Sequence, residues 1–191
     1  MADFSPDGFR GALAQHGGIS PSNKYRVELP GLGILKKANS TLKEYTSPAI
    51  IDLNYFCTSV GLPGKQVSTL TRDIGIGNKS IANAQVFAPV SLTFYLTESY
   101  EIRKYFQYWM DCVVSQNIGE PMYAGFYKNY VAPVKIYQQN KGQKNEIKDL
   151  YGIELIDAFP TDMELLRLNN QAQTAAMEMT VSLSYKTYKI L

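Results

Sequence analysis

The 191-residue chain contains few of the side chains that perform chemistry in enzymes. It has a single histidine, His16, so a Ser-His-Asp triad or a histidine-rich metal site would have to rest on that one residue. Its two cysteines, Cys57 and Cys112, are too few for a disulfide scaffold and lack the C-x-x-C spacing of zinc and redox sites. We expect both to be buried thiols. No catalytic residue, metal ligand or cofactor is predicted, and the composition disfavours an enzyme.

Charge and long apolar runs are also scarce. Only 19% of the residues are charged, and 19 Lys+Arg against 17 Asp+Glu leave a net charge of +2. This balance argues against a protein that wraps nucleic acid, which usually presents a strongly basic face. No run of about 18 apolar residues occurs, so no membrane span is predicted. The first residues also lack the basic and apolar regions of a secretory signal.

One segment superficially resembles a phosphate-binding loop. Residues 75–80 read Gly-Ile-Gly-Asn-Lys-Ser, but the Walker pattern needs a glycine directly before the lysine, where Asn78 stands. The first glycine of the pattern would fall at Asp73, and no strand, loop and helix surround the segment. We expect a flexible loop tip there and no nucleotide site.

Aromatic residues are abundant, with 14 tyrosines and 8 phenylalanines. Such residues favour strands, cores and interfaces. Alternating apolar and polar residues predict a mainly β, antiparallel sandwich or barrel. The expected strands are 24–29, 53–60, 90–97, 134–138, 151–159 and 177–189. An N-terminal arm, 1–22, with little structure of its own should precede one β domain, 23–191. Residues 34–50 are expected to form a loop, and 65–86 an extended hairpin or long loop.

One helix is predicted, from Ser99 as N-cap to about Gln116. Its apolar stripe recurs at helical spacing and includes Tyr105. Four other residues of this stripe should form the core of a helix packed on the sheet: Ile102, Phe106, Trp109 and Val113. A capping-box pattern at 161–166 predicts one further helical turn.

Two of the expected strands have a polar face with few charges, and in the last strand Glu178 and Lys186 share that face. In the strand at 90–97, Ser91 and Thr93 alternate with apolar residues, and in the last strand Thr180, Ser182 and Ser184 do the same. The pattern alone leaves two interpretations open. These faces are either ordinary solvent-exposed strands or a wall that lines something.

The order of the segments resembles the tail tube proteins of contractile-tailed bacteriophages. The resemblance covers 23–188 and rests on five segments: 23–29 (NKYRVEL), 56–64 (FCTSVGLPG), 90–94 (VSLTF) followed by a helix with Arg103, Phe106 and Trp109, 152–160 (GIELIDAFP), and a closing strand with 183–185 (LSY). One segment departs from the family. Where relatives often have Tyr-Gly-Pro, residues 74–76 read Ile-Gly-Ile.

The resemblance implies a structural subunit that closes into a hexameric ring, with rings stacked into a tube whose lumen passes the phage genome. It also implies tail sheath and baseplate proteins as partners, DNA that passes without specific binding, a place in the virion tail and assembly in the host cytoplasm. In this picture five residues line the lumen: Ser91, Thr93, Thr180, Ser182 and Ser184.

Three alternatives stay open at the sequence level. The long arm also suits a baseplate protein that initiates the tube. The same fold would suit the tube subunit of a related secretion or injection system. A small β-fold enzyme is the third and the least supported.

Overall fold

The computed structural model of the chain describes residues 5–16, 18–31, 50–75, 77–115, 121–141, 147–166, 168 and 176–191. Most of the predicted loop at 34–50 lies outside these ranges. Within them no helix is both long enough and apolar enough to cross a bilayer.

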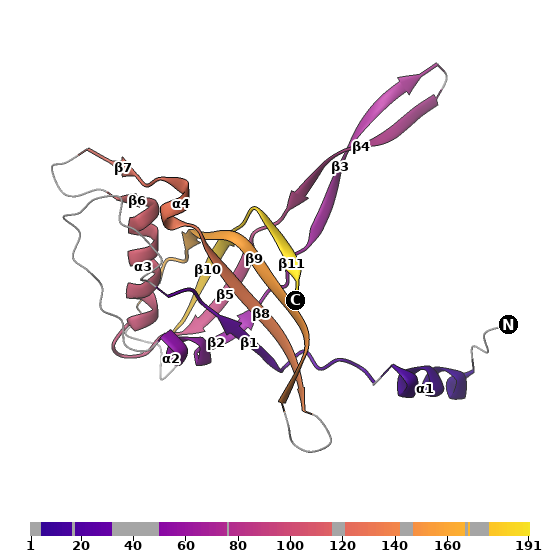
Figure 1. Ribbon diagram of the computed structural model, residues 1–191, viewed down its shortest axis with the longest axis horizontal. Coiled ribbons are helices and arrows are strands. Elements are labelled where there is room, and N and C mark those ends of the chain that lie inside the picture. The colour runs from indigo at the N-terminus through magenta and orange to yellow at the C-terminus, as the bar shows by residue number, and fades with distance from the viewer. Residues whose placement is uncertain are drawn as a thin grey trace.

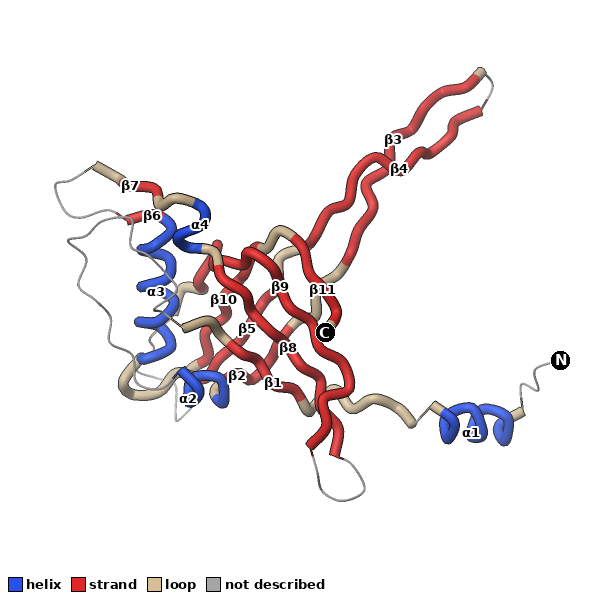
Figure 2. Tube along the Cα trace, viewed as in Figure 1, coloured by secondary structure: helices blue, strands red, loops and turns tan. Residues whose placement is uncertain are grey.

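One antiparallel seven-stranded sheet forms the body of the molecule. Its order is β1 (Tyr25–Glu28), β8 (Ala132–Lys141), β9 (Ile147–Met163), β10 (Glu178–Ser184), β5 (Val90–Tyr95) and β2 (Cys57–Val60), and β11 (Thr187–Ile190) also pairs with β9. The 17-residue β9 pairs with β8 over its first part and with β10 near its end. Strand β9 therefore belongs to both halves of the bent sheet, one with β8 and one with β10 (Figure 2). Both halves contribute residues to one core. The mainly β, antiparallel fold was predicted from the alternation of residues.

The strands predicted at 24–29, 90–97, 134–138 and 151–159 are confirmed as β1, β5, β8 and β9, although β8 and β9 are longer than expected. The strand predicted at 53–60 is half wrong. Ile50–Tyr55 forms helix α2, and only Cys57–Val60 is strand. The side chain of Leu53, which α2 contributes to the core, is buried. An apolar residue at this position is therefore compatible with a helix as well as with a strand.

The single strand predicted at 177–189 is also wrong, because the structure divides it into β10 and β11. The break lies at Tyr185 and Lys186. There the Lys186 amide donates to the carbonyl of Ile156 at 3.1 Å, and the Tyr185 hydroxyl donates to the carbonyl of Ala88 at 2.9 Å. The chain thus leaves its pairing with β5 and joins β9 at a different place.

Helix α3 (Glu101–Val113) confirms the predicted helix but not its cap. Tyr100, not Ser99, precedes the helix, and its backbone is left-handed with a φ of 53°. The Ser99 hydroxyl instead hydrogen-bonds with the Thr97 hydroxyl at 3.0 Å.

The helical turn predicted at 161–166 is wrong as well. There β9 continues to Met163, because its backbone pairs with Val181 and Ser182 of β10. Long-range pairing overrides the local capping pattern at this place.

The N-terminal arm has more structure than predicted. Pro6–Gln15 forms helix α1, with Ser5 as N-cap, and none of its residues is buried. The helix stands away from the body (Figure 1). The segment that follows α1 is attached to β8 by two hydrogen bonds. The Gln138 side-chain amide donates to the Ser20 hydroxyl at 2.7 Å and to the Pro21 carbonyl at 2.9 Å.

Residues 65–86 form the predicted hairpin. Strand β3 (Lys65–Ile74) pairs with β4 (Gly77–Phe87) and with no other described strand, and the two project from the body (Figure 1). The remaining described elements are a small sheet, β6 (Val114–Ser115) with β7 (Tyr123–Ala124), and helix α4 (Tyr127–Tyr130).

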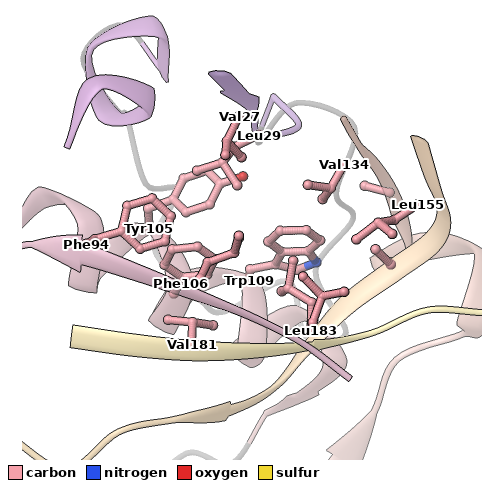
Figure 3. Packing of buried hydrophobic residues seen from close by; sticks show 14 of the residues in the cluster. Val27, Leu29, Phe94, Tyr105, Phe106, Trp109, Val134, Leu155, Val181 and Leu183 are labelled. Atoms are coloured by element: carbon pink, nitrogen blue, oxygen red, sulfur yellow. The ribbon is translucent and has the colours of Figure 1, made fainter. Parts of the chain in front are cut away.

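The core lies between the two halves of the folded sheet and is completed by α3 (Figure 3). Aromatic residues of α3 contact each other and β5, with the rings of Phe94 and Phe106 centred 5.4 Å apart. Their polar atoms are satisfied by backbone carbonyls. The Tyr105 hydroxyl donates to Pro30 and the Trp109 indole N–H to Tyr130, both at 2.7 Å.

Candidate functional site

The predicted polar residues of the two strands lie together on one face of β5 and β10. We call Ser91, Thr93, Thr180, Ser182 and Ser184 the polar wall. Ser91 lies directly opposite Ser182, and Thr93 opposite Thr180, with their hydroxyl oxygens 3.4 Å apart in the second pair. All five are exposed or half-buried, so the wall faces away from the core.

The strands on either side extend this surface. Ser59 of β2 is paired with Thr93, and Asp162 of β9 with Ser182. Nearby hydroxyls donate to the strand backbone, as Thr161 does to the carbonyl of Ser182 at 3.2 Å. These bonds hold side chains along the margin of the wall in defined positions.

No lysine or arginine occurs in β2, β5, β10 or residues 159–163 of β9. The charged residues of these four segments are the exposed carboxylates Asp162 and Glu178. The alternation of β10 places Glu178 on the polar face already at the sequence level. Asp162 was missed, because the capping-box pattern assigned it to a helical turn. The wall is therefore polar with a negative margin.

The outer face of the other half of the sheet is different, because ion pairs cover it. Arg26 contacts Glu28 at 3.2 Å and Asp149 at 3.1 Å. The Lys189 ammonium lies 2.6 Å from the Glu154 carboxylate. Among the described strands, the outer face of β1, β9 and β11 thus carries cations, whereas β2, β5, β10 and residues 159–163 carry none.

Most residues predicted to form the core stripe of α3 are buried in the core. Ile102, Phe106 and Trp109 are fully buried, and Val113 is half-buried. Tyr105, which belongs to the predicted stripe, is also buried, and so is Cys112. Cys112 was not assigned to the stripe, although its position follows the same helical spacing, which is the signal that could have included it.

The cysteines differ from each other. Cys112 is buried as expected, whereas Cys57 is only half-buried, and neither is in a disulfide. Desolvation at the sheet edge raises the pKa of the Cys57 thiol to about 11, although hydrogen bonding with the Ser59 backbone opposes this rise. Within the described ranges, no group of three or more His, Cys, Asp or Glu side chains could hold a metal ion.

The family model described as phage tail tube protein matches residues 20–191, and no curated protein sequence matches significantly.

Several solved structures are similar in fold. The sheath–tube complex of an extracellular contractile injection system, PVC, contains a chain with a TM-score of 0.56 and 11% identity, and 91% of each chain is covered. The baseplate of the anti-feeding prophage gives a TM-score of 0.55 and 10% identity, covering 91% of this chain and 95% of that one. The tube-terminating cap of the same prophage gives 0.56 and 11%, with 91% of each chain covered. At such identities the likeness concerns the fold alone.

Proposed function

The chain belongs to the phage tail tube protein family, and from this premise we propose that it is a structural subunit of the inner tube of a contractile phage tail. Its copies form hexameric rings that stack into a tube, and the lumen passes the genome. A single domain of this length is too small to enclose a DNA duplex, so this function belongs to the assembly. The tail is its place in the virion, and assembly occurs in the host cytoplasm.

The observation that carries this proposal is the polar wall. Lysine and arginine hold DNA by neutralising its phosphates and releasing counterions. A surface whose strands have no cation and whose margin carries Asp162 and Glu178 does not hold a duplex in this way. It suits a lumen through which DNA slides. The cation-bearing face of β1, β8, β9 and β11 suits this role less well. We therefore assign Ser91, Thr93, Thr180, Ser182 and Ser184 to the lumen.

The ends of the sheet support association into a ring. Strands β1 and β2 are the outermost strands of its order, and each has an edge without a partner among the described strands. Exposed edges favour pairing with another chain, and closure of a barrel removes them. Pairing between neighbouring subunits would satisfy these edges.

Two projecting elements are proposed to contact neighbouring subunits. The β3–β4 hairpin and helix α1 of the arm, residues 1–22, both stand away from the core, and α1 buries none of its residues. Helix α1 also lies outside the range matched by the family model.

A second candidate is a baseplate protein that initiates the tube. It is favoured by the arm, and the TM-score of 0.55 to a chain of the anti-feeding prophage baseplate is close to the 0.56 to a chain of the sheath–tube complex. A single ring of this subunit per particle would decide for the initiator, and many rings for the tube. A tube subunit of an injection system is distinguished by its genome neighbourhood, because head and portal genes indicate a phage.

The test of the proposed function is negative-stain electron microscopy of the purified chain. Rings or tubes of uniform bore are expected. A chain that stays monomeric at high concentration, or that turns over a small substrate, contradicts the proposal. We assign it no catalytic role.

A further inference from the structure

The far half of the β3–β4 hairpin has one face that combines apolar and basic residues. Leu70 lies opposite Ile81, and two residues further out Arg72 lies opposite Lys79, so both pairs share a face. We call these four residues the hairpin face. Leu70 is 61% exposed and Ile81 is 41% exposed. Because an isolated two-stranded hairpin is only marginally stable in water, this arrangement favours a partner.

The charges of the hairpin face indicate what kind of partner. Like charges directly opposite each other on neighbouring strands are destabilising. Arg72 and Lys79 are such a pair, and neither is in an ion pair with any described side chain. A partner that places carboxylates next to them would relieve the repulsion, and its apolar side chains would cover Leu70 and Ile81.

The same chain carries such a surface at the opposite end of β5. The hairpin joins β5 near Val90, which pairs with Leu183, whereas the other end of this ladder is Tyr95 opposite Glu178. Beyond that end lie two exposed leucines, Leu165 at 79% and Leu168 at 78%.

Exposed carboxylates accompany the leucines. Glu164 is held there by its amide, which donates to the Thr180 carbonyl at 2.9 Å. We call Glu98, Glu164, Leu165, Leu168 and Glu178 the acidic end. Two cations of α3 lie near it. Lys104 is 4.0 Å from Glu101, so Arg103 is left as the unpaired α3 cation near the three carboxylates within the described part of the chain.

Within one molecule the two surfaces are separated. The hairpin points away from the body (Figure 1), and β3 is about 33 Å long at about 3.3 Å per residue. The hairpin face lies beyond the Val90 end of β5, and the acidic end lies beyond the Tyr95 end. Two complementary patches at different places on one chain make a head-to-tail contact between copies, which propagates as a filament.

We infer that the hairpin face of one copy binds the acidic end of a copy in the next ring. This inference rests on the proposed function, since it names the surface that each hairpin meets when rings stack. Arg72 and Lys79 then lie beside Glu164 and Glu178, and Leu70 and Ile81 cover Leu165 and Leu168.

Charge exchange tests the pairing on the full chain. The double variant Arg72→Glu/Lys79→Glu should shorten the tubes seen by negative-stain microscopy at least tenfold and leave single rings in sedimentation velocity. Glu164→Lys/Glu178→Lys should do the same. The quadruple variant that combines them should recover at least half of the wild-type tube length. A matched control, Thr71→Glu/Ser80→Glu, puts two carboxylates on the neighbouring rung of the opposite face and should leave tube length unchanged.

Each other outcome has a definite meaning. Wild-type tube length in the Arg72→Glu/Lys79→Glu variant overturns the inference. Tubes lost in that variant and not recovered in the quadruple variant overturn the acidic end as the receiving surface, provided that rings and the circular dichroism spectrum show a folded chain. Absence of any tube from the wild-type chain contradicts the proposed function itself, which is a distinct result.

Discussion

Trp109 links helix α3 to the rest of the core through both packing and a hydrogen bond. Its side chain is fully buried, stacks on Phe106 with ring centroids 6.3 Å apart and donates its indole N–H to Tyr130. Trp109→Ala should lower the free energy of unfolding by about 3–5 kcal/mol, because it leaves a cavity and an unpaired carbonyl. Urea unfolding measures this loss.

Gln107→Ala is the control for Trp109→Ala, since it changes an exposed residue of the same helix and should alter stability by about 0.5 kcal/mol or less. Equal losses for the two variants would contradict the central place of Trp109 in the core.

Cys57 should react slowly with thiol reagents near neutral pH. Burial raises its pKa from 9.0 to about 11, and only the thiolate is the nucleophile. The rate of alkylation by iodoacetamide, followed on Cys112→Ser protein, should therefore increase up to about pH 11 in the folded chain and level off nearer pH 9 in denaturant.

The same shift has a consequence for stability. Because the folded-state pKa of Cys57 lies above its ordinary value, the contribution of this thiol is present below pH 9.0 and is lost as the pH rises to about 11. A folded-state alkylation profile that levels off near pH 9 would show that Cys57 is not desolvated as described.

Single residues on strands were the most predictable part of the molecule. Alternation is a local property with a period of two, so it placed Ser91, Thr93 and Thr180 on one face of the strands without knowledge of the fold. It could not show which strands are neighbours, and hence that Thr93 and Thr180 meet. The register of β9 and β10 was needed to show that the Asp162 carboxylate lies at the margin of the wall.

Removal of the β3–β4 hairpin should prevent the stacking of rings and leave the folding of the domain intact. Replacing residues 66–86 by Asn-Gly would join Lys65 to Phe87, which are already opposite each other, through a two-residue turn. All described side chains in this range except Ser68 are exposed. The variant should thus keep the melting temperature within a few degrees, measured by circular dichroism, but form no stacked tubes by electron microscopy. Stacking that persists without the hairpin would contradict its assignment as a contact between subunits.

Elements were predictable where local and long-range preferences agree. The apolar stripe of α3 and the alternation of β5 fall in this class. The helical turn predicted at 161–166 and the unbroken strand predicted at 177–189 fail for one physical cause, which is that tertiary pairing overrides a local signal. Residues 161–164 fit a capping box, yet Asp162 and Met163 pair with β10. The alternation runs on through Tyr185 although the backbone changes its partner there.

At the scale of the whole molecule, the charge of the wall should control how DNA behaves in an assembled tube. Ser91→Lys/Ser182→Lys introduces two cations on directly opposite residues of the wall in every subunit. Tubes of this variant should retain double-stranded DNA at low salt and release it as salt rises, because lysine–phosphate contacts release counterions. Co-sedimentation of DNA with tubes measures retention.

Gln107→Lys provides the control for the lysine variant, since this residue is exposed on α3 and not on the wall. It should cause much less DNA retention per lysine added. Equal retention by both variants would argue against the wall as the surface that meets DNA.

In the proposed tube, the polar wall of β5 and β10 lines the lumen. The most direct test of this assignment is a cryo-electron microscopy map of the assembled tube, at a resolution that places individual side chains. We expect the five wall residues on the inner surface, with the ion pairs of Arg26 and Lys189 elsewhere: Ser91, Thr93, Thr180, Ser182 and Ser184. A map with these five residues on the outer surface of the tube would contradict the assignment.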